Sequence, residues 1–111
     1  MTDTTLDHRF DAGWKILHAA GKLALDFFQR RDDLAIETKG QQDLVSIADQ
    51  EVERAIRGEL NRTFINDAII GEEDGAADDY LDAPGVWVID PIDGTSNFLR
   101  GMPYWSCVMA Y

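Results

Sequence analysis

Two acidic residues three positions apart follow directly on an apolar run in the last third of a 111-residue sequence. The run at 86–89 is rich in β-branched side chains, which predicts a strand buried on both faces. Asp90 ends the run, and Pro91 fixes φ and removes a backbone donor, so we expect the strand to stop there. Asp93 comes next, and Gly-Thr-Ser-Asn at 94–97 suits a tight turn or a helix start. Carboxylates suit a hard divalent cation and free N–H groups suit a phosphate, so the stretch predicts a metal-dependent enzyme acting on a phosphate ester.

A second acidic pair, Glu72 and Glu73, follows a short predicted strand at 67–70. If this strand and the one at 86–89 lie in one sheet, their ends bring three or four carboxylates into one cleft. Like charges in such a cluster raise one another's pKa, and a divalent metal is the usual solution. Magnesium takes one or two carboxylates together with substrate phosphate, and two such ions can activate water and stabilise a leaving oxygen.

A different phosphatase chemistry is the second choice for the same residues. Haloacid-dehalogenase-type phosphatases also carry Asp…Asp-Gly-Thr after a strand, with the first Asp as nucleophile. Their acids stand two positions apart, whereas Asp90 and Asp93 stand three apart, which does not place both on one side of a strand. The acids between 72 and 82 do not follow the spacing of an EF-hand calcium loop either.

The remaining elements must position these acids. Apolar residues at spacings of three and four predict an amphipathic helix over 4–29 and a second over 48–64. We expect Trp14, on the stripe of the first helix, to pack in the core. Alternation predicts a short half-exposed strand at 34–38, with a polar loop at 40–43 and one or two extended residues within 44–47. Ser46 and Asp49 then stand three apart, as in a capping box.

The last predicted strand, at 104–111, is rich in Trp, Val, Met and Tyr. Such a strand needs partners on both sides, and little of the chain is left to cover it. Its edge is therefore expected to associate, either with another copy or with further polypeptide.

Composition excludes several classes of partner. Ten basic residues against 21 acidic ones give a formal charge of −11, which argues against a basic nucleic-acid surface and against attraction to anionic lipid. The first residues carry no signal-peptide pattern and no apolar run approaches a membrane span, so a cytoplasmic protein is expected. Cys107 is the one cysteine, and its apolar neighbours predict a buried structural thiol rather than a nucleophile.

Three segments together resemble a known family. Residues 71–73 (Gly-Glu-Glu), 87–98 (Trp-Val-Ile-Asp-Pro-Ile-Asp-Gly-Thr-Ser-Asn-Phe) and 43–49 (Asp-Leu-Val-Ser-Ile-Ala-Asp) look like the N-terminal signatures of the inositol monophosphatase family, in the same order. This family belongs to the lithium-sensitive, magnesium-dependent phosphatase superfamily, with fructose-1,6-bisphosphatase. The resemblance implies the N-terminal portion of a layered αβαβα sandwich, an α+β fold in which two long helices pack on a mainly antiparallel sheet.

The resemblance also implies a metal site. Glu72 and Asp90 would ligate a first Mg²⁺ with the backbone carbonyl of Ile92, and Asp90 would bridge to a second ion held by Asp93. Glu73 would help catalysis through a third metal ion or a water, so two or three Mg²⁺ ions are expected.

Further residues are implied for substrate and water. Thr95, paired with Asp49, would position and deprotonate the attacking water, and the amides of Gly94 and Thr95 would hold the phosphate beside Asp93. Lys39 matches a lysine near the family's site. The implied reaction is hydrolysis of a small phosphorylated alcohol, inositol monophosphate above all, by attack of a metal-activated water without a covalent intermediate.

Family members are more than twice as long, and the Trp-Asp-x-Ala-x-Gly signature of their C-terminal half does not occur here. Residues 1–111 are therefore expected to form the N-terminal portion of a sugar-phosphatase-type domain. The alternatives are a histidinol-phosphate or other phosphatase of the same family, and a non-catalytic fragment that only binds metal or associates through its sheet edge. The expected partner is a small phosphorylated substrate, and the resemblance allows a homodimer.

Overall fold

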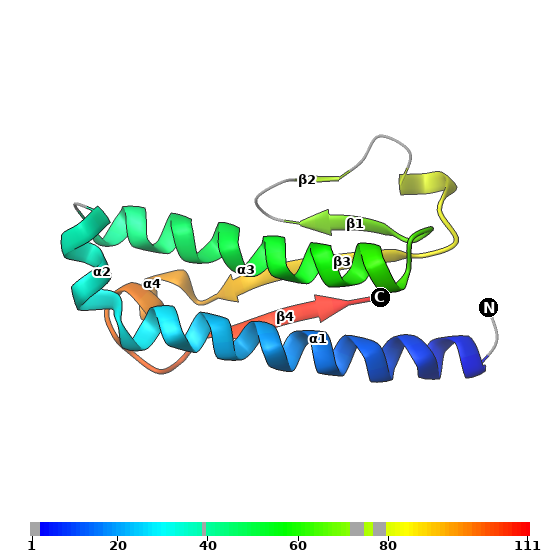
Figure 1. Cartoon of the computed structure of the whole chain (residues 1–111), viewed down its shortest axis with the longest axis horizontal. Helices are drawn as coiled ribbons and strands as arrows, with labels where there is room; N and C mark the ends of the chain where they lie inside the picture. The colour runs from blue at the N-terminus through cyan, green and yellow to red at the C-terminus, as the bar shows by residue number, and fades with distance from the viewer. Residues whose placement is uncertain (1–2, 39, 72–74, 77–79) are drawn as a thin grey trace.

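Helices cover one face of a small mixed sheet (Figure 1). The computed structural model describes residues 3–38, 40–71, 75–76 and 80–111. Its elements are α1 (Asp3–Gln29), α2 (Arg31–Thr38), α3 (Gln41–Thr63), β1 (Ala68–Gly71), β2 (Gly75–Ala76), a 3₁₀ turn η1 (Tyr80–Asp82), β3 (Val86–Asp93), α4 (Thr95–Leu99) and β4 (Ser106–Ala110). The order in the sheet is β2-β1-β3-β4; β1 and β3 are parallel, and β2 and β4 run antiparallel to their neighbours.

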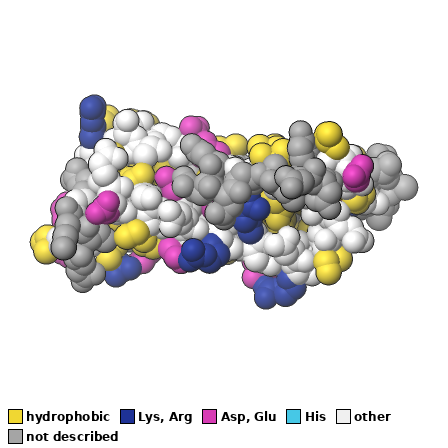
Figure 2. Space-filling view, turned by 90° about the horizontal axis from the view of Figure 1, so that it is seen from above, with side chains coloured by type: hydrophobic (Ala, Val, Ile, Leu, Met, Phe, Trp, Pro, Cys, Tyr) yellow, Lys and Arg dark blue, Asp and Glu magenta, His cyan; other side chains and the backbone are white. Residues whose placement is uncertain are grey.

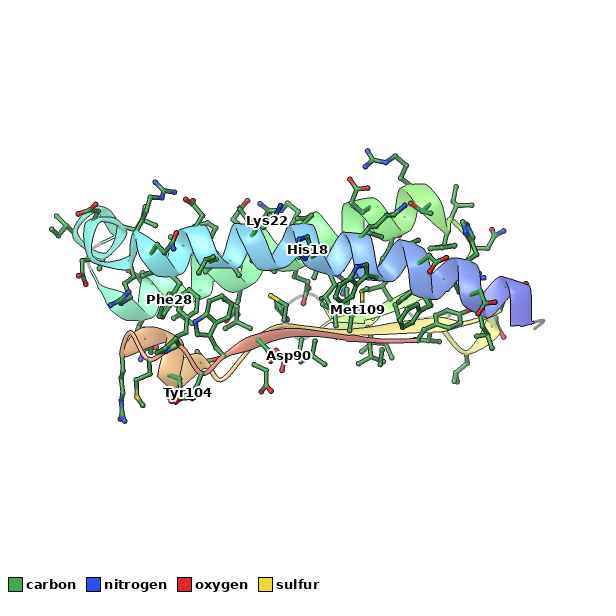
Figure 3. All side chains as sticks on the ribbon, turned by 90° about the horizontal axis from the view of Figure 1, so that it is seen from below. His18, Lys22, Phe28, Asp90, Tyr104 and Met109 are labelled. Atoms are coloured by element: carbon green, nitrogen blue, oxygen red, sulfur yellow. The ribbon has the colours of Figure 1, made fainter. Side chains whose placement is uncertain are left out.

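The main core lies between the sheet and the pair of long helices. Ala20 and Ala24 of α1 and Val52 and Ile56 of α3 are buried with Trp87 of β3, among others. The small alanines allow the two helices to approach each other and the sheet closely. Figure 3 shows the helices on one side of the sheet, with Met109 of β4 facing α1.

The first helix has the predicted length but not the predicted buried stripe. Ile16, Ala20 and Ala24 are buried, whereas Phe10 and Trp14 are 73% and 63% exposed. The expectation that Trp14 packs in the core was therefore wrong. The buried face of the N-terminal half instead runs through Ile16, and α1 at 27 residues is much longer than the strands that it covers.

The segment at 34–38 is helical, so the predicted strand there was wrong. Asp32 and Asp33 lie in the first turn of α2, where negative charge stabilises a helix N-terminus. A five-residue alternation is also compatible with a short helix, and contact with α3 decides between the two. Similarly, the expected extended residues within 44–47 and the Ser46–Asp49 box lie inside α3, whose N-cap is Gly40.

The central strand differs from its prediction in two ways. β3 continues through Pro91 to Asp93, and its pairing with β4 shifts register between Asp90 and Asp93. A register shift leaves backbone groups unpaired, which is where a strand tolerates proline. In addition, the strand is buried on one face only, because Trp87 and Ile89 face the helices while Val88 is 49% exposed.

A buried ion pair ties the start of α1 to the sheet. Arg9 donates two hydrogen bonds to Asp67, at 2.8 and 2.9 Å, and the indole N–H of Trp87 donates to Asp67 at 3.0 Å. The guanidinium of Arg9 also lies over the rings of Phe64 and Tyr111, 4.7 and 4.9 Å from their centroids. The hydrogen bonds that Arg9 donates to Asp67 raise the pKa of Arg9.

Candidate metal and phosphate site

The strands that precede the two acidic pairs lie side by side in one sheet, and the carboxyl end of β1 lies beside the middle of β3. In their parallel pairing Gly71 stands opposite Ile89, and these residues directly precede Glu72 and Asp90 in the sequence. Glu72, Glu73 and Lys39 lie outside the described residues. Two predicted metal ligands therefore follow paired positions at one end of the sheet.

Apolar anchors hold the segment that carries the two aspartates. Ile92 and Phe98 are 1% and 0% exposed and form a second hydrophobic cluster with Val45 and Ala48 of α3. Phe98 also contacts the ring of Phe28 at a centroid distance of 5.4 Å, and Phe28 lies between the helices and α4 (Figure 3). The buried side chains of Ile92 and Phe98 lie close in sequence to Asp90 and Asp93, and they fix the backbone from which the two acids project.

Asp90 and Asp93 have different surroundings. The Oδ1 atom of Asp90 is buried and has no hydrogen-bond partner among the described residues. Asp93, beyond the register shift, is exposed. A buried carboxylate oxygen without a partner costs about 1–3 kcal/mol, and a bound cation is one way to offset that cost.

The turn after Asp93 requires glycine. Gly94 adopts φ 91° and ψ 43°, in the left-handed region, and precedes α4. A Cβ at this position would lie 2.8 Å from the carbonyl oxygen of Tyr104, so close approach also excludes a side chain. The side-chain amide of Asn97 donates to the same carbonyl at 2.8 Å. The hydroxyl of Thr95 donates to the carbonyl of Ile92 at 3.4 Å, which brings these two predicted site residues together.

Asp49 of α3 and Asp90 of β3 both lie close to Cys107 of β4. Burial raises the pKa of the Cys107 thiol to about 11, and the charges of Asp90 and then Asp49 contribute to the shift. The two carboxylates therefore converge on one region although 41 positions of sequence separate them. A thiol with this pKa is a poor nucleophile at neutral pH, in keeping with the predicted structural role of Cys107.

The residues present fit a hard divalent cation. Carboxylate and carbonyl oxygens are the donors that Mg²⁺ prefers, and Asp90, Asp93 and the carbonyl of Ile92 supply them from adjoining positions. Within residues 3–38, 40–71, 75–76 and 80–111, no group of three or more acidic, His or Cys side chains is close enough to hold a metal ion. A complete site made by acidic, His or Cys side chains of this chain would therefore have to include acids outside the described residues, which is where Glu72 and Glu73 lie.

Sequence analysis missed a buried charge next to this site. Glu53 of α3 has no exposed side-chain surface and accepts a hydrogen bond from Nε of Arg57 at 3.1 Å. The signal was the i, i+4 spacing on a predicted helix, but the neighbouring pair of Glu51 and Arg54 has similar spacing and lies at the surface.

The inositol monophosphatase family model matches residues 6–110. The chain belongs to the inositol monophosphatase family. A histidinol-phosphatase from Streptomyces coelicolor is 45% identical over 92 residues, which are 83% of this chain and 33% of that protein. The Nus factor SuhB of Pasteurella multocida is 38% identical over 91 residues, 82% of this chain and 34% of that one. Inositol monophosphatase II from Staphylococcus aureus superposes with a TM-score of 0.73 at 26% identity, over 90% of this chain and 35% of the other.

These members of the family confirm the fold predicted from the signatures. The described elements form the N-terminal portion of the inositol monophosphatase fold, with helices packed on a small mixed sheet. The chain spans about a third of the length of the curated relatives that it matches. The family is one of phosphomonoesterases, and the relatives differ in the activity that their names state.

Two predictions from the composition concern the location of the protein and its macromolecular partners. On the face shown in Figure 2, described basic side chains are scattered among acidic ones instead of forming one patch. No helix in the described part of the chain is long and apolar enough to span a bilayer. The cytoplasmic location and the absence of nucleic-acid partners stay predictions.

Proposed function

We propose that this protein is a Mg²⁺-dependent phosphomonoesterase whose substrate is a small phosphorylated alcohol, with inositol monophosphate as the first choice. The observation that carries the proposal is the buried Oδ1 of Asp90, which has no hydrogen-bond partner among the described residues and follows Ile89, the residue of β3 that pairs with Gly71 at the end of β1. Membership of a phosphatase family supports the reaction class.

The ligands proposed for Mg²⁺ are Asp90, Asp93, the carbonyl of Ile92 and, from the end of β1, Glu72. When bound, the metal would polarise the phosphoryl group and lower the pKa of a coordinated water. The carboxylates of this site would otherwise repel the substrate, since the chain carries a formal charge of −11.

The chain's own groups would orient the reactants. Thr95 would hold the attacking water by its hydroxyl, and Asp49, a buried carboxylate on α3, would accept the proton. The N–H groups of Gly94 and Thr95 would bind the phosphate, helped by Lys39. Glu73 is proposed as a helper through a further ion or water.

The nature of the alcohol is the less determined part. The name of the Streptomyces coelicolor relative favours histidinol phosphate as the alternative substrate. Inositol monophosphate and histidinol phosphate carry the same phosphate group, which residues 90–95 would bind in either case. Specificity for the alcohol would therefore depend on residues outside that segment.

The test is phosphate release from myo-inositol 1-phosphate and from histidinol phosphate, with Mg²⁺ and with EDTA. The proposal expects release that requires Mg²⁺ and disappears in Asp90→Asn. The matched control is Asp26→Asn, which neutralises an exposed aspartate paired with Arg30 on α1 and should leave activity unchanged. Release that persists in EDTA would refute the metal-dependent mechanism, and a folded chain that releases none would favour the non-catalytic fragment.

A further inference from the structure

A fully buried carboxylate lies beneath the end of β1. Glu53 projects from α3 with no exposed surface, and its Oε2 accepts the 3.1 Å hydrogen bond from Arg57. The Arg57 side chain is only 21% exposed, so the pair is largely removed from water. Neither residue has a role in the reaction proposed above. Burial of two charges costs free energy that a pair of apolar side chains would not, so this pair calls for an explanation.

The side chains of Glu53 and Arg57 lie in close contact with the backbone of Gly71. A Cβ built on Gly71 would overlap Oε1 of Glu53 and would lie 2.5 Å from its Cδ and 2.7 Å from Nη2 of Arg57. The absence of a side chain at Gly71 therefore lets the two charged groups reach the strand backbone itself. On its other sides Gly71 pairs with Ile89 of β3 and with Gly75 of β2. The last residue of β1 is thus confined by α3 and by both neighbouring strands.

The confined position of Gly71 bears on the proposed metal site, because Gly71 lies next to it in the sequence. Gly71 directly precedes Glu72, and its partner Ile89 directly precedes Asp90. A displacement of Gly71 along α3 would change the separation of the two acids that follow. The hydrogen bond between Glu53 and Arg57 fixes both side chains on α3, so Gly71 lies against a surface whose shape is set, whereas flexible apolar side chains could yield to it.

We propose that Glu53 and Arg57 are positioning residues, which fix Gly71 at the end of β1 against Ile89, the residue before Asp90, and so support binding of a divalent cation at the proposed metal site. The inference rests on the proposed function, because it assigns the pair to the metal site of that function. It adds two residues on α3 that do not touch the metal and act through Gly71.

The first test is Mg²⁺ affinity by titration calorimetry on the 111-residue chain and its Glu53→Gln variant. We expect Kd to rise about 10- to 100-fold, the loss usual when a residue supporting a metal ligand is changed. The matched control is Glu51→Gln, which neutralises a half-exposed glutamate two residues earlier on α3, paired with Arg54. Its Kd should stay within about twofold of the parent. A Glu53→Gln chain that binds Mg²⁺ as tightly as the parent would overturn the proposal, even if its Tm were lower.

A second variant covers a failure of Glu53→Gln to fold. Arg57→Lys keeps the positive charge but replaces the planar guanidinium by a single ammonium group, so it should fold and still weaken Mg²⁺ binding about 10-fold. Unchanged affinity in this variant would equally overturn the proposal.

Hydrogen exchange of the β1 amides separates this inference from the proposed function. If the parent chain binds no Mg²⁺, the metal-dependent function is refuted for this chain, and exchange then decides the positioning role alone. Faster exchange at Gly71 in Glu53→Gln, with Glu51→Gln like the parent, would support it. Equal exchange in all three chains would overturn it.

Discussion

Replacing Asp90 by Asn should have opposite effects on stability with and without metal. The substitution keeps the shape of the side chain and removes its charge. In the metal-free chain the buried Oδ1 of Asp90 has no hydrogen-bond partner among the described residues. An unsatisfied buried group costs about 1–3 kcal/mol, and a neutral amide oxygen costs less than a carboxylate oxygen. We therefore expect Asp90→Asn to raise the metal-free unfolding free energy by about 1 kcal/mol, or Tm by about 5 °C.

Saturating Mg²⁺ should reverse this order. At a free Mg²⁺ concentration of 100 times Kd, binding adds about 2.7 kcal/mol to the stability of the parent chain. The variant, which lacks a ligand charge, should gain almost none of it. The two chains would then exchange places, with the parent more stable by about 1.7 kcal/mol.

Urea unfolding followed by tryptophan fluorescence, in EDTA and in Mg²⁺, measures both differences. Asp26→Asn serves as control and should lose about 0.5 kcal/mol in either condition, because its pair with Arg30 is exposed. A metal-free Asp90→Asn chain less stable than the parent by more than about 1 kcal/mol would show that the carboxylate has a structural partner. An undiminished gain from Mg²⁺ in the variant would show that Asp90 is not a ligand.

Three further predictions concern the framework of the site. Asp67→Asn should lower the unfolding free energy by about 3 kcal/mol in urea, because it breaks the buried pair with the N-terminal part of α1; a loss no larger than that of Asp26→Asn would contradict this. Gly94→Ala should lower the unfolding free energy by about 2 kcal/mol, and with it Tm, because of the positive φ of Gly94 and its close backbone contact. Gly21→Ala, in open space on α1, should raise Tm. Equal shifts of Tm in the two variants would refute strain at Gly94. Because the pKa of Cys107 is raised from 9.0 to about 11 in the folded chain, its contribution to stability is complete below pH 9 and falls as the pH rises to about 11; Cys107→Ala should remove this fall from urea titrations at pH 8–11.

The position of the site could be predicted from sequence because strand ends are marked by changes of residue type. Apolar runs that stop at Glu72 and Asp90 mark the residues at which the parallel pairing of β1 with β3 ends, and a shared sheet brings those positions together. The continuation of β3 through Pro91 could not be foreseen in this way, since it depends on a register shift against β4.

Surface and core were harder to separate on the long helices. Trp14 and Ala20 lie on the same predicted stripe, yet only Ala20 of the two is buried. Glu53 and Glu51 both have arginine partners one turn away, yet only Glu53 is buried. In each case the sequence gives spacing along one helix, whereas burial depends on a neighbouring element whose position is set by contacts distant in sequence.

The contact between the two ends of the chain has a consequence for the order of folding. Arg9 lies over the ring of Tyr111, and a Cβ on Gly13 would lie 3.3 Å from the methyl group of Met109. During synthesis α1 emerges early, about 100 residues before these partners. Until β4 emerges, α1 can pack against α2 and α3 and then against β1 and β3, with the face that meets β4 open to other chains or to chaperones. We therefore expect a helical pair to form first and the sheet to close late, with a folding rate set by that long-range closure.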